Sequence, residues 1–308
     1  MFDRPEFIRP EVREFKQVKV ALDQTPEAFF KSWLAGLTAT PRYCGTHRRT
    51  QLVLNHRNTR FRPVYADWEQ RRPKPGEFEF HAVYICRSCC VAYARCPPEF
   101  HETSFDTFDA STPERAAALA KAREFVAQVN KHSCGFALFV GPPGTGKTRL
   151  TSNVVRELEV RNALYVRQSE LTCALRTTYG HKDVFLYPSR RRDDDEDDGC
   201  PESPSPLEIV QEIAFLVLDE MGCTALANDE RLFLDELLKH RYDHRKPTIL
   251  ISNLPLTGMA DSLGLKELLG DALTDRVRDA TGNGKFIVQF TGESYRRTTG
   301  ENYLHGIL

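Results

Sequence analysis

Uninterrupted apolar runs of four or five residues recur along the chain from residue 136 onward. Such runs are typical of strands that are buried on both faces of a sheet. Between them, leucine and valine recur every three or four residues, which predicts helices with one apolar face. Strands that alternate with helices predict a parallel sheet with right-handed crossovers, and therefore an α/β fold. The predicted strands are residues 136–140, 163–166, 215–218 and 248–251, with a last, less apolar strand at 286–290.

A glycine-rich octapeptide follows the first of these strands. Residues 141–148 read GPPGTGKT and fit the G-x-x-x-x-G-K-[ST] pattern of a P-loop. The glycines let main-chain N–H groups turn inward around phosphate oxygens, at the N-terminus of the helix that follows. Lys147 would supply charge to the β- and γ-phosphates of ATP, and the Thr148 hydroxyl would bind Mg²⁺. The predicted ATP contacts are Gly141, Pro142, Pro143, Gly144, Thr145, Gly146, Lys147, Thr148 and Arg149.

Polar side chains end two of the later strands. Asp219 and Glu220 end one apolar run, and Asn253 ends the next. Beside a P-loop, Asp219 would hold Mg²⁺, usually through water, and Glu220 would polarise the water that attacks ATP. Asn253 would position that water, or it is only a turn residue. Together with Lys147 these residues predict ATP hydrolysis, and the carboxylate pair argues against a small-molecule kinase, which must exclude water.

Cysteine and histidine gather in the N-terminal third. Cys44 and His47 form a CxxH pair, and Cys86 and Cys89 form a CxxC pair. Two residues between ligands is the spacing of a tight turn whose side chains converge on one Zn²⁺, and two pairs supply the four ligands of a structural site. The pairs lie 38 residues apart, more than in small zinc fingers, and reduced cysteines in a small core are the alternative. A second possible ligand set is Cys86, Cys89, Cys96 and His101.

The chain divides into three predicted parts. Residues 1–40 include the apolar spacing of an amphipathic helix and are predicted to be a helical N-terminal segment. Residues 41–101 form the predicted zinc-binding and partner-binding domain, and residues 102–308 form the predicted ATPase domain. Within the ATPase domain, residues 188–206 contain three arginines, an acidic block and several prolines. Because such a segment cannot build a core, it predicts a disordered charged insertion.

Composition is that of a globular protein. The 308 residues are 41% hydrophobic and 28% charged, which is ordinary for this class. No apolar run approaches the roughly 18 residues of a membrane helix, and the charged N-terminus is unlike a signal peptide. We therefore expect a cytoplasmic protein with no membrane contact. Its nine cysteines would there be reduced thiols or metal ligands rather than disulfides.

The net charge of −1 conceals an asymmetry along the chain. Residues 1–100 carry a charge of +6 and the remainder carries −7. A basic N-terminal part beside a mildly acidic ATPase domain predicts binding to nucleic acid or to an acidic partner. A solvated surface without a ligand is the alternative.

The motifs, taken in order, resemble the DnaC/IstB group of AAA+ proteins, the bacterial and phage helicase loaders and their transposition relatives. The resemblance spans residues 105–297, about two thirds of the chain, and many phage members also carry CxxH and CxxC pairs. It departs at the charged insertion and at Asp271, near which some members have an arginine. The motifs that carry it are residues 120–123, GPPGTGKT at 141–148, LVLDEMG at 216–222, and residues 241–253, 273–278 and 294–297.

The resemblance implies an AAA+ P-loop NTPase fold, a parallel sheet flanked by helices, with a small N-terminal zinc-binding domain. It also implies an ATP site between neighbouring subunits of a ring or open spiral. Arg276 would reach the γ-phosphate of the neighbour as an arginine finger, with Arg278 as second choice. A surface salt bridge is the plainer role for Arg276. Basic residues near the helix at 170–179 would line a path for single-stranded DNA, namely Arg167, Arg176 and Lys182.

Three functions are compatible with these patterns. The first is an ATP-dependent loader that delivers a replicative helicase onto single-stranded DNA during DNA replication. The second is a transposition helper ATPase that assembles on duplex DNA and recruits a transposase. Both would act as nucleotide-dependent homo-oligomers. The third is a zinc-dependent interaction module with a vestigial ATPase, against which the intact Lys147, Asp219 and Glu220 argue.

Overall fold

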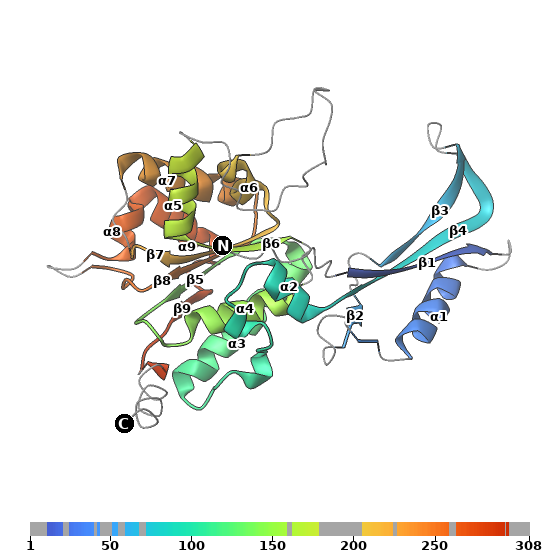
Figure 1. Cartoon of the computed structure of the whole chain (residues 1–308), viewed down its shortest axis with the longest axis horizontal. Coiled ribbons are helices and arrows are strands. Elements are labelled where there is room, and N and C mark those ends of the chain that lie inside the picture. Colours follow the sequence, from blue (N-terminus) through green and yellow to red (C-terminus); the bar gives the residue numbers. More distant parts are fainter. Residues whose placement is uncertain are drawn as a thin grey trace. The chain divides into compact units, whose positions relative to one another are not determined.

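The chain separates into two compact units, Met1–Tyr93 and Ala94–Leu308. The computed structural model of the protein (Figure 1) describes residues 11–20, 25–39, 42–43, 51–54, 59–67, 72–158, 162–178, 205–223, 227–258, 263–292 and 294–295. Most of the predicted charged insertion lies outside the described residues. None of the helices in the described part of the chain is both long and apolar enough to span a membrane.

The larger unit is built on a five-stranded parallel sheet. Its strand order is β6–β7–β8–β5–β9, and each neighbouring pair is parallel. Every residue of β5 and of β8 is buried, because helices cover both faces, and this explains the uninterrupted apolar runs. The strands are β5 (Phe136–Val140), β6 (Ala163–Arg167), β7 (Phe215–Met221), β8 (Thr248–Ser252) and β9 (Ile287–Gln289).

Two helical layers enclose this sheet (Figure 1). On one face, Phe125 of α3 packs against Phe215 and Phe286, with ring centroids 6.4 and 5.3 Å apart. On the other face, α5 to α9 share a leucine-rich core with the strands. The predicted α/β fold, a parallel sheet flanked by helices, is confirmed. The helices are α3 (Pro113–His132), α4 (Lys147–Glu157), α5 (Gln168–Thr178), α6 (Pro206–Glu212), α7 (Asn228–Asp243), α8 (Leu265–Leu269) and α9 (Asp271–Ala280), with 3-10 turns at Pro98–Phe100 and Phe105–Thr107.

A fully buried arginine ties α6, α7 and β8 together. Arg241 of α7 is 0% exposed. Its guanidinium donates to the main-chain oxygens of Val210 and Ile213, each at 2.9 Å, and of Pro247 at 2.8 Å. It also donates to the Thr248 hydroxyl at 2.7 Å. Burial lowers the pKa of Arg241 to about 9, so the group still carries its charge at neutral pH.

Replacing Arg241 should destabilise the larger unit severely. Arg241→Ala removes the donors of several buried carbonyl groups and leaves a cavity, so we expect a loss of about 3–5 kcal/mol in the free energy of unfolding. Urea unfolding followed by circular dichroism measures the loss. The matched control is Lys239→Ala, an exposed position on the same helix, which should change stability by no more than about 0.5 kcal/mol. Equal effects of the two variants would contradict this role.

The smaller unit contains an antiparallel sheet centred on its longest strand. That strand, β4 (Arg72–Ile85), pairs with β1 (Glu11–Lys19) along one edge. Its other edge pairs with β2 (Val53–Leu54) and β3 (Arg60–Asp67). The helix α1 (Pro26–Thr38) precedes β2, and the short helix α2 (Arg87–Tyr93) follows β4.

One face of this small sheet is covered by α1 (Figure 1). The rings of Phe30 and Trp33 on α1 lie 5.2 and 5.6 Å from the ring of Phe80 on β4. Phe61 of β3 completes the aromatic cluster, 5.2 Å from Phe30. The apolar side of the predicted N-terminal helix is thus its packing surface on the sheet.

Two predicted boundaries need correction. Residues 1–40 were expected to be helical, but Glu11–Lys19 form the strand β1. The reason is antiparallel pairing along the whole of β1 with β4, which begins only at Arg72. The apolar residues of β1 recur every third residue, at Val12, Phe15 and Val18, so the local sequence does not indicate a strand. The charged insertion was expected to extend to residue 206, but Ser205 caps α6, which begins at Pro206. Ser205 accepts from the Glu208 N–H, and the Glu208 side chain accepts in return from the Ser205 N–H, so this sequence starts a helix.

Candidate functional site

The glycine-rich loop connects the central strand β5 to α4, as the sequence predicts. Gly141, Gly144 and Gly146 have positive φ angles of 143°, 78° and 95°. Gly141 could not carry a side chain, because a Cβ there would lie 2.1 Å from the main-chain oxygen of Phe290. Pro142 and Pro143 form the exposed outer part of the loop. The main chain therefore takes the course that a phosphate-binding loop requires.

Lys147, the first residue of α4, points back over the loop. Its ammonium group is buried and donates to the main-chain oxygens of Gly141 and Pro142 at 2.6 and 2.7 Å. Thr145 donates from its hydroxyl to the same Pro142 oxygen at 2.8 Å. The positive charge is thus held at the phosphate-binding turn, beside the N-terminus of α4.

Hydroxyl and carboxylate oxygens meet beside the loop. The Thr148 hydroxyl donates to Oδ2 of Asp219, the acidic residue on β7, at 3.0 Å. Asp219 is 4% exposed. Its other oxygen, Oδ1, accepts from the Glu220 N–H at 2.6 Å. Two oxygen donors of this kind suit Mg²⁺, which prefers carboxylate and hydroxyl oxygen.

A third residue at this corner was not predicted. The Tyr165 hydroxyl on β6 donates to Asp219 Oδ2 at 2.6 Å. Burial, followed by the neighbouring Asp219 carboxylate, raises the pKa of Tyr165 above its usual value. Tyr165 therefore remains a donor and fixes the orientation of the Asp219 carboxylate. In the sequence, Tyr165 is only one more residue of an apolar run.

Glu220 occupies an unusual backbone conformation. Its φ of 58° lies in the left-handed region, which is uncommon for a residue other than glycine and costs about 1–3 kcal/mol. The side chain is 47% exposed, and its carboxylate lies 3.8 Å from the guanidinium of Arg167 at the end of β6. The Glu220 carboxylate is therefore accessible to water.

Asn253 follows β8, the strand between the P-loop strand and the acidic strand. Its side-chain amide donates to the sulfur of Cys223 at 3.4 Å. The hydroxyl of the preceding Ser252 donates to the main-chain oxygen of Met221 at 2.7 Å. Asn253 thus lies at the carboxyl edge of the sheet, and its contact with Cys223 links the ends of β8 and β7.

Two aromatic rings, those of Phe108 and Tyr295, lie beside the P-loop. A Cβ placed on Gly146 would lie 3.3 Å from the ring of Tyr295 and 3.5 Å from that of Phe108. The Tyr295 N–H donates to the main-chain oxygen of Gly144 at 2.9 Å, and the Arg115 guanidinium lies 4.1 Å from the centre of the Tyr295 ring. Tyr295 was expected only as part of the family motif at residues 294–297.

The predicted arginines that the structure describes lie on four different elements. Arg149 of α4 donates to the main-chain oxygen of Thr107 at 2.5 Å, so it holds the segment before α3 rather than pointing into the loop. Arg276 and Arg278 lie on α9 and are not among the residues gathered at the P-loop. Arg167 pairs with Glu220, as described above. Arg176 lies on α5, but its side chain and all of Lys182 lie outside the described residues.

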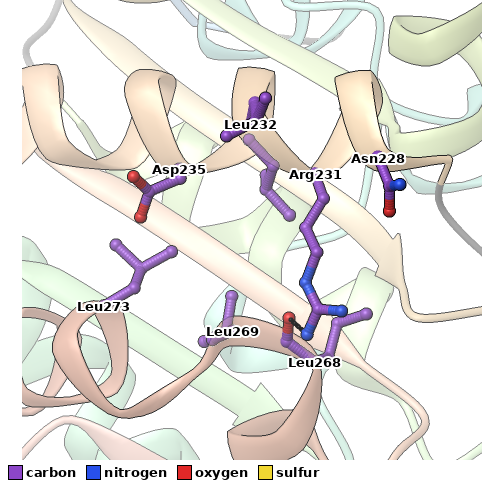
Figure 2. A pocket seen from close by; sticks show the side chains of 8 residues that line it. Asn228, Arg231, Leu232, Asp235, Leu268, Leu269 and Leu273 are labelled. Atoms are coloured by element: carbon purple, nitrogen blue, oxygen red, sulfur yellow. Dashed lines mark hydrogen bonds between the residues drawn. The ribbon is translucent and has the colours of Figure 1, made fainter.

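A pocket of about 380 Å³ lies between α7, α8 and α9, apart from the P-loop. Figure 2 shows its leucine lining and Arg231 reaching from α7 to the end of α8. There the guanidinium donates to the main-chain oxygens of Glu267 and Leu268 at 2.7 and 2.8 Å. None of the predicted ATP contacts lines this pocket, so we do not assign it to the nucleotide.

Two of the four predicted zinc ligands are described. Cys86 and Cys89 are each 1% exposed, and the Cys89 N–H donates to the Cys86 sulfur at 3.4 Å. Cys44 and His47 lie outside the described residues. Among the side chains that the structure describes, no three of His, Cys, Asp and Glu are grouped as metal ligands. The alternative ligand Cys96 is buried as well, and burial raises the pKa of its thiol to about 12.

A P-loop on β5, an acidic β7 and a polar strand end on the intervening β8 define an AAA+ ATPase. The comparisons with known proteins agree. Residues 190–302 match the family described as IstB-like ATP binding protein. Over these residues the chain is similar to that family, and a longer stretch of it is distantly similar to the DnaC helicase loaders.

Individual relatives show how far the similarity extends along the chain. The replicative helicase loader DnaC of Escherichia coli K12 is 26% identical over 209 residues, which cover 67% of this chain and 74% of DnaC. YdaV of the same organism, whose function is uncharacterised, is 26% identical over 201 residues, or 65% of this chain and 70% of YdaV. A crystal structure of the DnaC helicase loader aligns at 20% identity with a TM-score of 0.48, over 63% of this chain and 100% of that chain.

Proposed function

We propose that the protein is an ATP-dependent loader that delivers a replicative helicase onto single-stranded DNA. The observation that carries the proposal is the similarity to replicative helicase loader DnaC over 209 residues, combined with the ATP site on the same sheet. We place its action in the cytoplasm, where replicating DNA and ATP are both present. Bound ATP would keep the loader and helicase together, and hydrolysis would release the helicase onto DNA.

Each residue of the site would have its own role in ATP hydrolysis. The P-loop N–H groups and Lys147 would bind the β- and γ-phosphates, and Thr148 with Asp219 would hold Mg²⁺, which supplies positive charge to the phosphate oxygens. Glu220 would accept the proton of the attacking water, which becomes part of the released phosphate. Asn253 would orient that water.

A homo-oligomer would complete the site. Arg276 on α9 would reach ATP bound by a neighbouring subunit, where a guanidinium stabilises charge on the transferred phosphoryl group. In support, α9 lies beside the leucine-lined pocket of Figure 2, and Leu232 at its rim is 72% exposed. An exposed leucine beside a pocket lined by further leucines suits a contact between subunits.

We also propose a structural Zn²⁺ held by Cys44, His47, Cys86 and Cys89. The CxxC pair follows β4 directly, and β2 pairs with β4 at Ile85. Tyr43 and Gln51, which flank the CxxH pair, form an antiparallel bridge just before β2. These pairings support an approach of the two ligand pairs at one end of the small sheet. Thiolate and imidazole ligands at two-residue spacing fit a closed tetrahedral zinc site.

Metal analysis tests the zinc proposal. The purified chain should contain about one Zn²⁺, and Cys86→Ser with Cys89→Ser should lose it, because two of four ligands are gone. The matched control changes the exposed thiols Cys173 and Cys223 to serine and should retain the metal. Zinc content that is unchanged in the Cys86/Cys89 variant would contradict the ligand set.

A transposition helper ATPase that binds duplex DNA and recruits a transposase is the second candidate. The match of residues 190–302 to an IstB-like family favours it. The two candidates differ in the nucleic acid and in the partner protein. A loader requires the replicative helicase and single strands, whereas a transposition helper requires duplex DNA and neither helicase nor single strands.

Mass photometry separates the two candidates. The protein is mixed with a non-hydrolysable ATP analogue and, in turn, with the host replicative helicase, single-stranded DNA or duplex DNA. A nucleotide-dependent complex with the helicase supports the loader. Assemblies on duplex DNA that form regardless of the helicase would contradict it and support the transposition helper.

A further inference from the structure

The face of the small sheet opposite α1 carries a row of flat, polar or aromatic side chains. In the register of β1, β4 and β3, Phe15 lies opposite His81, and His81 lies opposite Arg60. Side chains in one row across a sheet share a face. The Phe15 and His81 rings are in edge-on contact, with centroids 5.1 Å apart. Phenyl, imidazole and guanidinium groups thus follow one another across three strands.

The next row forms a polar network beside this one. Gln17, Glu79 and Arg62 face one another across the same three strands. The Arg62 guanidinium donates to Glu79 at 2.8 Å, and His81 lies 3.4 Å from the same carboxylate oxygen. Hydrogen bonds from Arg62 and His81 outweigh the effect of burial and lower the pKa of Glu79. The carboxylate therefore anchors the two cationic or polar groups on this face.

The part of this face around Phe15 is accessible to solvent, whereas Val83 and Ile85, farther along β4, are buried. Phe15 is 54% exposed, although it is a large apolar side chain on a strand. Arg13, Lys19 and Arg60 are exposed as well. We call Arg13, Phe15, Lys19, Arg60, Arg62 and His81 the sheet-face patch. Among the described side chains on this face its four lysine and arginine residues exceed the two carboxylates, Glu77 and Glu79.

The opposite face of the sheet packs against α1. There Lys16 and Val18 of β1 lie with Trp33 and Phe80 in a pocket of about 290 Å³ under α1. Its aromatic rings pack on one another and serve the core. Phe15 lies on the other face of β1, so it is not part of this core.

We infer that the sheet-face patch binds single-stranded DNA. Exposed rings and guanidinium planes on an open sheet stack with unpaired bases, and surrounding basic residues attract the phosphates. Duplex DNA buries its base faces, so this combination favours a single strand. The excess of positive charge complements the phosphate backbone. The contact would lie in the N-terminal unit and would not need ATP, so it goes beyond the ATP-dependent function proposed above and does not depend on it.

Fluorescence anisotropy of a labelled oligothymidylate tests the patch. An oligonucleotide of about 20 nucleotides, longer than most single binding sites of this type, is titrated with the full chain without nucleotide or helicase. Phe15→Ala and Arg60→Glu should each weaken binding by about 5-fold or more. Arg60→Glu should also reduce the slope of log affinity against log salt by about 0.7 for each phosphate that the protein no longer neutralises.

Two matched controls place the effect on one face. Lys16→Glu reverses a charge on the same strand, β1, but on the α1 side, and Phe29→Ala removes a partly exposed phenylalanine from α1. Both should leave affinity within about 2-fold. Phe15→Trp provides a direct readout, because the fluorescence of its indole should be quenched as bases stack on it.

Several results would overturn the inference. Affinity that survives both Phe15→Ala and Arg60→Glu would do so, as would equal weakening by Lys16→Glu. An indole at position 15 whose emission ignores the oligonucleotide, or a preference for unlabelled duplex as competitor, would also contradict it. Because helicase and nucleotide are absent, these results leave the loader proposal standing, and failure to bind a helicase would leave the patch standing.

Discussion

Glu220→Gln should reduce ATP turnover by about 10²- to 10⁴-fold and leave ATP binding nearly unchanged. The amide has the shape of the carboxylate but cannot accept a proton from the attacking water, and general-base catalysis is worth a factor of this size. Glu220 is 47% exposed and contacts Arg167 at 3.8 Å, so the substitution should not disturb the fold. Phosphate release measures turnover, and a fluorescent ATP analogue measures binding.

Glu170→Gln is the matched control for that experiment. Glu170 on α5 also pairs with Arg167, at 3.8 Å, but it is not at the end of the acidic strand. Removing its charge should change turnover by no more than about 2-fold. Turnover that survives Glu220→Gln, or that falls equally in both variants, would remove Glu220 from its role as the base.

Lys147→Ala should have the second large effect, and the quantity that it lowers first is ATP affinity. Its ammonium group is held at the phosphate-binding turn by the oxygens of Gly141 and Pro142, and a charge-assisted hydrogen bond is worth about 1.5–3 kcal/mol. We therefore expect ATP affinity to fall by about 10- to 100-fold. Turnover should fall with it, since the same charge stabilises the transition state.

Lys121→Ala controls for the loss of a lysine that bonds to main chain. Lys121 of α3 donates to the Ile287 oxygen at 2.8 Å, away from the P-loop, and its removal should leave ATP affinity unchanged. Affinity retained by Lys147→Ala would contradict the assignment of the loop to ATP. The contrast between Lys147→Ala, which loses binding, and Glu220→Gln, which keeps it, separates the two roles.

The parts of the fold that depend on local pattern could be predicted from the sequence. The strands of the larger unit are buried on both faces, so their apolar runs identify them directly. Parallel strands place their carboxyl ends at one edge of the sheet. For that reason Thr148 and Asp219, 71 residues apart, could be expected to meet, and their oxygens are 3.0 Å apart.

The parts of the fold that depend on pairing between distant segments could not be predicted from the sequence. In β1 the apolar residues Val12, Phe15 and Val18 recur every third residue, which does not indicate a strand, and its partner β4 begins more than 50 residues later. Tyr165 reads as one more apolar strand residue until the order of the strands sets it beside Asp219. The Tyr295 hydroxyl donates to the carboxylate of Asp109, 186 residues away. No local pattern in the sequence predicts that contact.

The central claim is that ATP hydrolysis by this protein transfers a helicase to single-stranded DNA. The most direct test uses circular single-stranded DNA, which offers no end for a closed helicase ring to thread. Helicase bound to the circle is separated from free helicase by gel filtration and quantified. We predict that helicase appears on the circle only with this protein and ATP, and that Glu220→Gln forms the complex with helicase but leaves little active helicase behind. Equal loading with and without this protein, or loading that the Lys147→Ala variant supports in full, would contradict the account.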